Sequence, residues 1–183
     1  LKWKKSLFNS SDYPNWTING LGCNFTADNA GRIFAFTHDD HLIEKENTVL
    51  IKGSGVDTET FKPSSEPHSA PVVMLASRML WDKGICEFVE AAREIKSEDG
   101  NARFVLVGDV DLENPMTITA SQIKKWVDEG IIEWWGKQKN MPEIFSQAHI
   151  ISLPSYAEGL PKVLIEAAAC GKPIVTTDVS GCR

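Results

Sequence analysis

The chain has 183 residues and a formal net charge of −6, from 19 Lys and Arg against 25 Asp and Glu. Because domains usually run to about 100–150 residues, there is room for one well-packed domain and a short appendage, but not for two full α/β domains. The acidic balance excludes the basic surface with which nucleic-acid binders neutralise phosphates. Any phosphate-binding site is therefore expected to be local.

Cysteine usage indicates the redox compartment. The four cysteines, which show neither CxxC spacing nor the density of a disulfide scaffold, are Cys23, Cys86, Cys170 and Cys182. We expect free thiols, because disulfides persist mainly in oxidising compartments. The sequence shows no signal peptide or long apolar run, so we expect a cytosolic protein.

The N-terminal part of the chain carries few structural signals. Residues 1–30 are polar and aromatic without a clear period, and no structure is assigned to them. Short strands are expected at residues 33–37 and 48–52, and residues 62–68 resemble a linker. The run from His38 to His41 contains possible metal ligands, but a short polar run after a strand is more typical of a solvated turn.

A regular alternation of strands and helices begins after the linker. Residues 72–76 form an apolar run typical of a strand buried on both faces. Residues 83–97 are expected to form a helix, whose apolar face consists of Ile85, Phe88, Val89, Ala92 and Ile95. Further strands are expected at 103–107, 131–135, 150–153 and 174–177, and further helices at 119–129, 141–148 and 161–169.

This alternation predicts an α/β fold with a doubly wound parallel sheet. We divide the chain into an N-terminal or interdomain segment, residues 1–47, and a Rossmann-like domain, residues 48–183. Lys172 and Pro173 begin the last strand, and no further covering helix follows before Arg183. We therefore expect this domain to be incomplete or truncated.

Ligands of open α/β sheets bind beyond the carboxyl ends of the strands, so the residues that follow each apolar run are the candidates. These residues are Arg78 and Lys83, Gly108 and Asp109, Gly136 and Lys137, Glu158 and Gly159, and Ser180 and Gly181. Several of them can bind anions or accept hydrogen bonds. A ligand site is expected at this edge of the sheet.

The segment from Glu158 to Glu166 has the marks of a helix N-terminus. Pro161 stands at a first-turn position and Gly171 just past the expected end. Unpaired backbone N–H groups at such a terminus can bind an anion. Glu166 lies roughly one and a half turns into the helix, so both carboxylates are expected to face one cleft at different depths.

Arg78 and Lys83 flank the start of an earlier helix, where the helix dipole disfavours positive side chains unless an anion lies nearby. A bound diphosphate would provide that anion. Taken alone, this segment is equally compatible with two solvated cations paired with Asp82 or Glu87.

Together these motifs resemble the donor domain of glycosyltransferase family four, a retaining family with the two-domain GT-B fold. The resemblance rests on residues 76–84, ASRMLWDKG, and on Glu158 and Glu166 with seven residues between them. It extends over residues 48–183 and includes the stretches 55–63 and 168–178.

The resemblance implies a role for each candidate. Arg78 and Lys83 would hold the donor diphosphate, Glu166 would hydrogen-bond the ribose, and Lys137 would border the nucleobase. Glu158 and the Gly159 and Leu160 amides would contact the sugar and the distal phosphate. The implied donor-binding set is Arg78, Lys83, Lys137, Glu158, Gly159, Leu160, Val163 and Glu166, of which Arg78, Lys83 and Glu158 would be catalytic.

The implied activity is transfer of a sugar from a nucleoside diphosphate sugar, with a UDP-sugar favoured, and with retention at the anomeric carbon. The resemblance implies no metal and no further cofactor. Electrostatic stabilisation of the departing diphosphate by Arg78 and Lys83 would be the main catalytic effect. Glu158 and Glu166 are assigned to binding rather than to glycosidase-type acid/base catalysis, since a nucleotide leaving group needs little protonation.

The acceptor would be a glycan or a lipid-linked glycan, as in bacterial polysaccharide synthesis, bound by an N-terminal domain that this chain lacks. The full-length protein would then be cytoplasmic, or peripheral at the inner membrane face, and this chain alone is expected to bind the donor without transferring sugar. One alternative is a nucleotide-sugar-binding module without catalysis. Another is a different GT-B enzyme, such as a sugar-nucleotide epimerase or a phosphorylase, although the Glu158 to Glu166 spacing argues against it.

Overall fold

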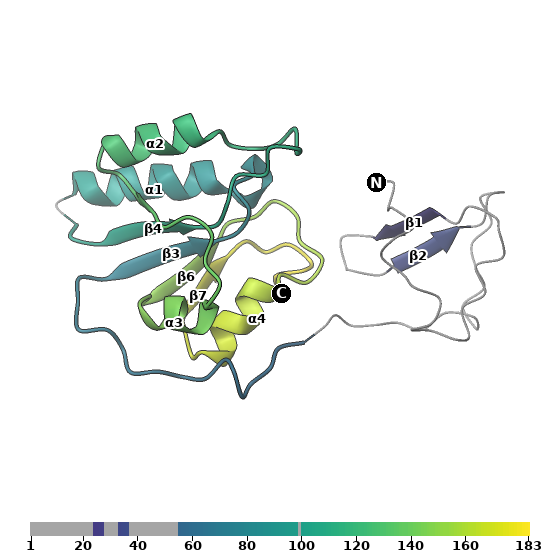
Figure 1. The fold of residues 1–183 in the computed structure, drawn as a ribbon. Coiled ribbons are helices and arrows are strands. Elements are labelled where there is room, and N and C mark those ends of the chain that lie inside the picture. Colours follow the sequence, from purple (N-terminus) through teal and green to yellow (C-terminus); the bar gives the residue numbers. More distant parts are fainter. Residues whose placement is uncertain (1–23, 28–32, 37–54, 99) are drawn as a thin grey trace.

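The computed structural model describes residues 24–27, 33–36, 55–98 and 100–183 (Figure 1). Strands β1 (Asn24–Ala27) and β2 (Ile33–Phe36) form an antiparallel pair in which Asn24 faces Phe36. β2 agrees with the strand expected at 33–37, whereas β1 lies in a stretch to which the sequence assigned no structure. Four residues are too few to show a hydrophobic period. The strand expected at 48–52 and the run from His38 to His41 lie outside the described residues.

Five parallel strands form the main sheet, in the order β5-β4-β3-β6-β7. They are β3 (Val72–Ala76), β4 (Arg103–Val107), β5 (Glu133–Trp134), β6 (Ile150–Leu153) and β7 (Ile174–Thr176). β3 pairs with β4 on one side and with β6 on the other. The chain therefore builds outward in one direction and then in the other from β3, which confirms the predicted doubly wound sheet.

Helices cover both faces of this sheet. Figure 1 shows α1 (Ile85–Ser97) and α2 (Ala120–Asp128) on one face, and α3 (Met141–Ser146) and α4 (Lys162–Ala169) on the other. β3 contributes Leu75 to the core beneath α1 and α2, and Met74 to the core beneath α3 and α4. Its side chains alternate between two buried layers, which explains the continuous apolar run.

The first helix begins later than the sequence indicated. Residues Trp81–Lys83 form a short 3-10 turn, η2, and α1 starts only at Ile85. Gly84 lies between them in the left-handed conformation, with φ of 71°, and this breaks the helical path. At the other end of α1 the apolar pattern weakens, because Ile95 is 40% exposed while the other four predicted positions are buried.

The other elements match their predicted positions with shifted ends. Thr119 caps α2, since its hydroxyl oxygen accepts the Gln122 N–H at 3.2 Å. β5 spans two residues instead of the expected five, and α3 stops at Ser146 rather than at 148. α4 begins at Lys162, with Pro161 in the capping position.

The linker-like stretch is fastened to the sheet. The ring of Phe61 lies 6.4 Å from the ring of Phe145, centroid to centroid. The Nδ1 atom of His149 accepts the Val72 N–H at 3.0 Å, and its Nε2 atom lies 3.0 Å from the Pro67 carbonyl. A carbonyl can only accept, so Nε2 is the donor to Pro67. The linker thus packs as part of the domain.

Within the described part of the chain, no helix is both long enough and apolar enough to cross a membrane. Cys86, Cys170 and Cys182 are free thiols, as expected.

We predict that Phe145→Ala strongly destabilises the domain. Phe145 on α3 is fully buried and its ring lies beside that of Phe61, just before the linker, so truncation removes apolar burial and leaves a cavity. The expected loss is roughly 3–5 kcal/mol, measured as the free energy of unfolding in urea. Leu112→Ala is the control, because Leu112 is 86% exposed, and it should change stability by about 0.5 kcal/mol or less. Equal losses for both variants would contradict the assigned core.

Candidate functional site

Four of the predicted donor-binding residues are divided between two pockets at the carboxyl edge of the sheet. The other four, Arg78, Lys83, Gly159 and Leu160, line neither pocket. The first, here called the Glu166 pocket, is lined by Ala76, Ser77, Val107, Gly108, Lys137, Gln138, Met141, Val163 and Glu166. It is a shallow, open cavity of about 180 Å³, smaller than the roughly 300–1,000 Å³ typical of complete small-molecule sites. The structure therefore brings together three predicted residues: Lys137, Val163 and Glu166.

The floor of the Glu166 pocket depends on Gly108. Its φ is 141°, and a Cβ atom at this position would lie 1.8 Å from the Ser77 carbonyl oxygen. The Gly108 N–H donates to the Gly136 carbonyl at 2.8 Å, and its own carbonyl accepts from the Trp134 indole at 2.9 Å. Only glycine allows the ends of β3 and β4 to approach this closely.

Glu166 is the one carboxylate among the residues that line this pocket, and it is half-buried. Burial raises its pKa above the ordinary value of 4.5, while nearby Lys162 acts in the opposite direction. The described residues donate no side-chain hydrogen bond to it. An ionised carboxylate held in this way is prepared to accept hydrogen bonds from hydroxyl groups of a ligand.

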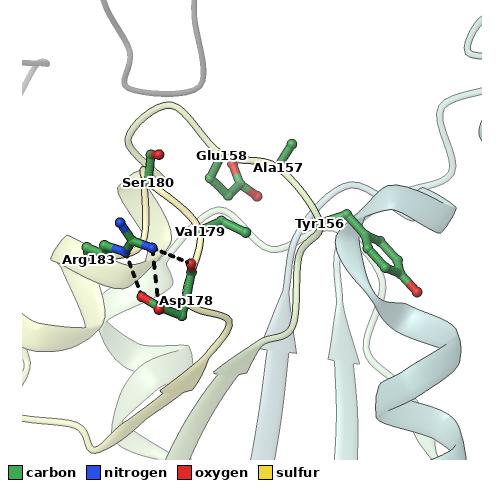
Figure 2. Close-up of a pocket in the computed structure, with 7 residues that line it drawn as sticks. All are labelled: Tyr156, Ala157, Glu158, Asp178, Val179, Ser180 and Arg183. Carbon is green, nitrogen blue, oxygen red and sulfur yellow. Dashed lines mark hydrogen bonds and ion pairs between the residues drawn. The ribbon is translucent and has the colours of Figure 1, made fainter.

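The second pocket, here called the Glu158 pocket, is lined by Tyr156, Ala157, Glu158, Asp178, Val179, Ser180 and Arg183. Figure 2 shows Asp178 and Arg183 paired at one side of it, and Tyr156 pointing away from it. Arg183 donates to Asp178 at 2.6 Å, and this hydrogen bond lowers the pKa of Asp178. Sequence reasoning missed Asp178 and Arg183, because nothing local marks two exposed residues as a pocket wall.

Glu158 is held by an ion pair. Its Oε1 atom lies 2.8 Å from Lys83 Nζ, and the two side chains are only 13% and 15% exposed, respectively. Loss of one partner from a pair this shielded from water would leave an uncompensated buried charge. The ion pair joins η2 to the loop after β6.

The same loop is hydrogen-bonded to the η2 turn. The Asp82 carbonyl accepts from the Ser155 hydroxyl and from the Tyr156 N–H, both at 3.0 Å. A Cβ atom on Gly84 would lie 2.1 Å from the Pro154 carbonyl oxygen, so glycine is required for the approach. The motif Asp82-Lys83-Gly84 thus fixes the loop through a carbonyl, a charge and the absence of a side chain.

Arg78 is placed differently from Lys83. Its side chain is 63% exposed and forms an ion pair at 3.0 Å with Asp111, in the loop after β4. The local pairings with Asp82 or Glu87, one of the two readings of this segment, are wrong. Glu87 instead accepts a hydrogen bond from the Tyr156 hydroxyl. No local pattern could identify these partners, because they lie 33 and 75 residues away from the cations.

The N-terminus of α4 lies between the two glutamates in the sequence. Its capping residue is Pro161, and no side chain caps the first turn. Gly159 and Leu160 are exposed just before it. The first N–H groups of a helix have no intrahelical acceptor, so this end of α4 can bind an anion. Glu158 and Glu166, expected at two depths of one cleft, line separate pockets because one precedes this terminus and the other lies inside the helix.

No cluster of three or more His, Cys, Asp or Glu side chains suited to a metal ion exists among the residues that the structure describes.

Sequence comparison identifies related proteins. The family described as Glycosyl transferases group 1 matches residues 70–183. An N,N'-diacetylbacillosaminyl-diphospho-undecaprenol alpha-1,3-N-acetylgalactosaminyltransferase of Campylobacter jejuni is 36% identical over 75% of this chain and 38% of that protein. The gpi3 subunit of phosphatidylinositol N-acetylglucosaminyltransferase of Schizosaccharomyces pombe is 26% identical over 96% of this chain and 40% of that protein. The chain thus spans 38–40% of the length of these two curated relatives.

Solved structures share the fold. HepE of Anabaena, crystallised with UDP and glucose, superposes with a TM-score of 0.58 at 23% identity over 69% of this chain and 37% of that one. A glycosyltransferase of Rickettsia africae gives a TM-score of 0.62 at 20% identity over 75% of this chain and 40% of that one. These likenesses confirm the expected Rossmann-like fold.

We predict that Glu166→Gln becomes more stable relative to the wild type as pH rises. The folded state raises the pKa of Glu166, so the stability due to its protonated form is full below pH 4.5 and is lost as pH rises through the folded-state pKa. Glutamine does not titrate. Melting temperatures at about pH 4 and about pH 7 should show the variant gaining on the wild type between them. Glu94→Gln, on the exposed face of α1, is the control. A pH-independent difference for Glu166→Gln would contradict the burial effect.

Proposed function

Because the chain belongs to the Glycosyl transferases group 1 family, we propose that it binds the nucleotide-sugar donor of an enzyme that transfers the sugar with retention. The observation that carries this proposal is the placement of Glu158 and Glu166 in two pockets, one before and one within α4. This arrangement suits a ligand that has an anionic centre and hydroxyl groups at both ends. A nucleoside diphosphate sugar has that chemistry.

The Glu166 pocket is proposed to take the nucleoside. Met141 and Val163 supply apolar surface for a base, while Lys137 and Gln138 offer polar groups. Glu166 would accept hydrogen bonds from two ribose hydroxyls, which would offset the cost of keeping its carboxylate ionised. The crystal structure of HepE with UDP supports uridine as the base.

The diphosphate is proposed to bind at the α4 N-terminus. The Gly159 and Leu160 amides and the first turn of α4 would donate to it, with Lys83 and Arg78 supplying positive charge. Lys83 would then share its charge between Glu158 and a phosphate, and Arg78 would turn from Asp111 toward the ligand. As the bond to the sugar breaks, these cations stabilise the negative charge that develops on the leaving diphosphate.

The Glu158 pocket is proposed to take the sugar. Lys83 donates to one oxygen of Glu158 and orients the carboxylate, so the other oxygen can accept sugar hydroxyls. Arg78, Lys83 and Glu158 are therefore the proposed catalytic residues. We propose no metal ion or further cofactor.

A lipid-linked or glycan acceptor is proposed for the whole enzyme, which would act at the inner face of a membrane. The names of the two curated relatives support this, since one is specific for a diphospho-undecaprenol acceptor and the other for phosphatidylinositol. We further propose that residues 48–183 form the donor domain and that residues 1–47 lie outside it. The contacts of Phe61 with Phe145 and of Pro67 with His149 support including residues 61–67 in that domain. The alternatives of a non-catalytic binding module or an epimerase are not favoured, because the named relatives are transferases.

We predict that the two glutamate variants separate by ligand. Glu166→Gln should weaken the binding of UDP and of a UDP-sugar alike. The amide keeps one acceptor oxygen, but its nitrogen only donates, so it cannot accept a hydroxyl on each of two atoms as a carboxylate does. Glu158→Gln should leave UDP nearly unchanged and weaken only the UDP-sugar, by roughly 1–3 kcal/mol. Isothermal titration calorimetry on the 183-residue chain measures both affinities, with Glu94→Gln as the control. Identical losses for Glu158→Gln with and without the sugar would rule out the assignment.

We also predict that the two cations act on phosphate. Lys83→Ala and Arg78→Ala should each weaken UDP by roughly tenfold or more, because charge-assisted hydrogen bonds are the strong ones, while uridine should bind nearly as before. Lys124→Ala is the matched control, since Lys124 pairs with Asp128 on the exposed side of α2. Equal losses for uridine and UDP would contradict the role.

Glu158 is left without its cation in Lys83→Ala, so the double variant with Glu158→Gln separates that effect from phosphate binding. The double variant should still bind UDP more weakly than the wild type does, while its affinity for uridine stays nearly unchanged.

A further inference from the structure

The turn after β7 packs directly against the loop that carries Glu158. A Cβ atom on Gly181 would lie 2.2 Å from the Glu158 carbonyl oxygen and 2.6 Å from the Gly159 carbonyl oxygen. Both are backbone atoms, which cannot rotate aside as the end of a side chain can. The φ of Gly181 lies outside the left-handed region, so the glycine is required here for space rather than for conformation.

Both segments of this contact, the turn after β7 and the loop that carries Glu158, are held in place by further hydrogen bonds. On one side, the Cys182 N–H donates to the Val179 carbonyl at 2.9 Å, and Arg183 binds the side chain and the carbonyl of Asp178. The Thr177 hydroxyl donates to the Ser155 carbonyl and ties the start of this turn to the loop.

On the other side, the loop is attached to η2 through the Asp82 carbonyl and the pair of Lys83 with Glu158. Residues 154–159 are therefore clamped between the start of α1 and the turn at residues 178–183.

We propose that Gly181 is a positioning residue for the sugar-binding loop. An added methyl group must displace the Glu158 and Gly159 carbonyls by about 1 Å to reach an ordinary contact distance. This displacement shifts Glu158 relative to Lys83 and shifts the amides that precede α4. The effect on the sugar rests on the function proposed above, but the effect on loop geometry does not. Gly181 acts through the loop, since it is not among the residues that line either pocket.

The chain offers a matched control for this substitution. A Cβ atom on Gly100 would lie 2.6 Å from the Ile95 carbonyl oxygen at the end of α1, and the φ of Gly100 also lies outside the left-handed region. Gly100→Ala therefore produces a comparable backbone clash away from both pockets. The two variants should lose similar amounts of thermal stability. A difference between them in the Glu158 loop would therefore come from where the clash lies and not from a general loss of stability.

Amide hydrogen exchange tests the geometry without a ligand. The Tyr156 N–H donates to the Asp82 carbonyl at 3.0 Å and reports whether the loop is seated. Gly181→Ala should speed exchange at Tyr156 by roughly tenfold or more, because local opening becomes easier, and Gly100→Ala should not. Thr177→Val removes the link to the Ser155 carbonyl without adding bulk, and it should give a smaller change in the same direction. This second variant serves if Gly181→Ala does not fold.

Calorimetry tests the consequence for the sugar. Gly181→Ala should bind UDP within about twofold of the wild type, but it should lose most of the additional affinity that a UDP-sugar shows over UDP, since misplacement by about 1 Å is costly for oriented contacts. Unchanged exchange at Tyr156 together with unchanged preference for the UDP-sugar would overturn the positioning role. If the wild type binds neither ligand, the proposed function fails, and the exchange rates still decide whether Gly181 positions the loop.

Discussion

The parallel pairing of β3 with both β4 and β6 is the constraint on which the rest of the domain depends. It places β3 at the centre of the sheet, so its side chains enter the two cores on opposite faces and its carboxyl end lies beside the ends of both neighbours. Parallel strands all end at the same edge, and the strand order reverses at β3. The residues after each strand therefore converge on a common surface, although they lie up to 100 residues apart in the sequence.

The two glutamates of the site have opposite electrostatic surroundings. Glu158 is shielded from water together with a cation, Lys83, and this pair holds its loop against η2. Glu166 is half-buried and has no such partner among the residues that the structure describes, and its raised pKa reflects that burial. A carboxylate that the fold leaves incompletely satisfied gains most when a ligand supplies hydrogen bonds. The burial of Glu166 thus costs stability at neutral pH, as is common where a residue is arranged for binding rather than for folding.

The sequence by itself determined the fold class, the order of the elements and most of the candidate residues. Apolar runs and helical periods are local properties, so β3, β4 and β6 were predicted at their observed bounds. Glu158, Lys83 and Lys137 were identified because residues that follow strands in such a sheet lie at the binding edge. Glu166 was identified from the helix that starts near Pro161 and from the family resemblance. The ends of elements were predicted less well. Gly84 is left-handed, so α1 starts two residues later than predicted, and a strand as short as β1 shows no hydrophobic period.

Only the tertiary structure decided how these residues pair. The partners of Arg78 and Lys83, the division of the glutamates between two pockets and the contact of Gly181 with the Glu158 carbonyl all join segments that are distant in the sequence. Such contacts depend on how the loops after different strands pack against one another at the edge of the sheet. Local patterns of residue types do not specify these partners, because a glycine or a lysine occurs in many local sequences and its contacts depend on which distant segment packs beside it.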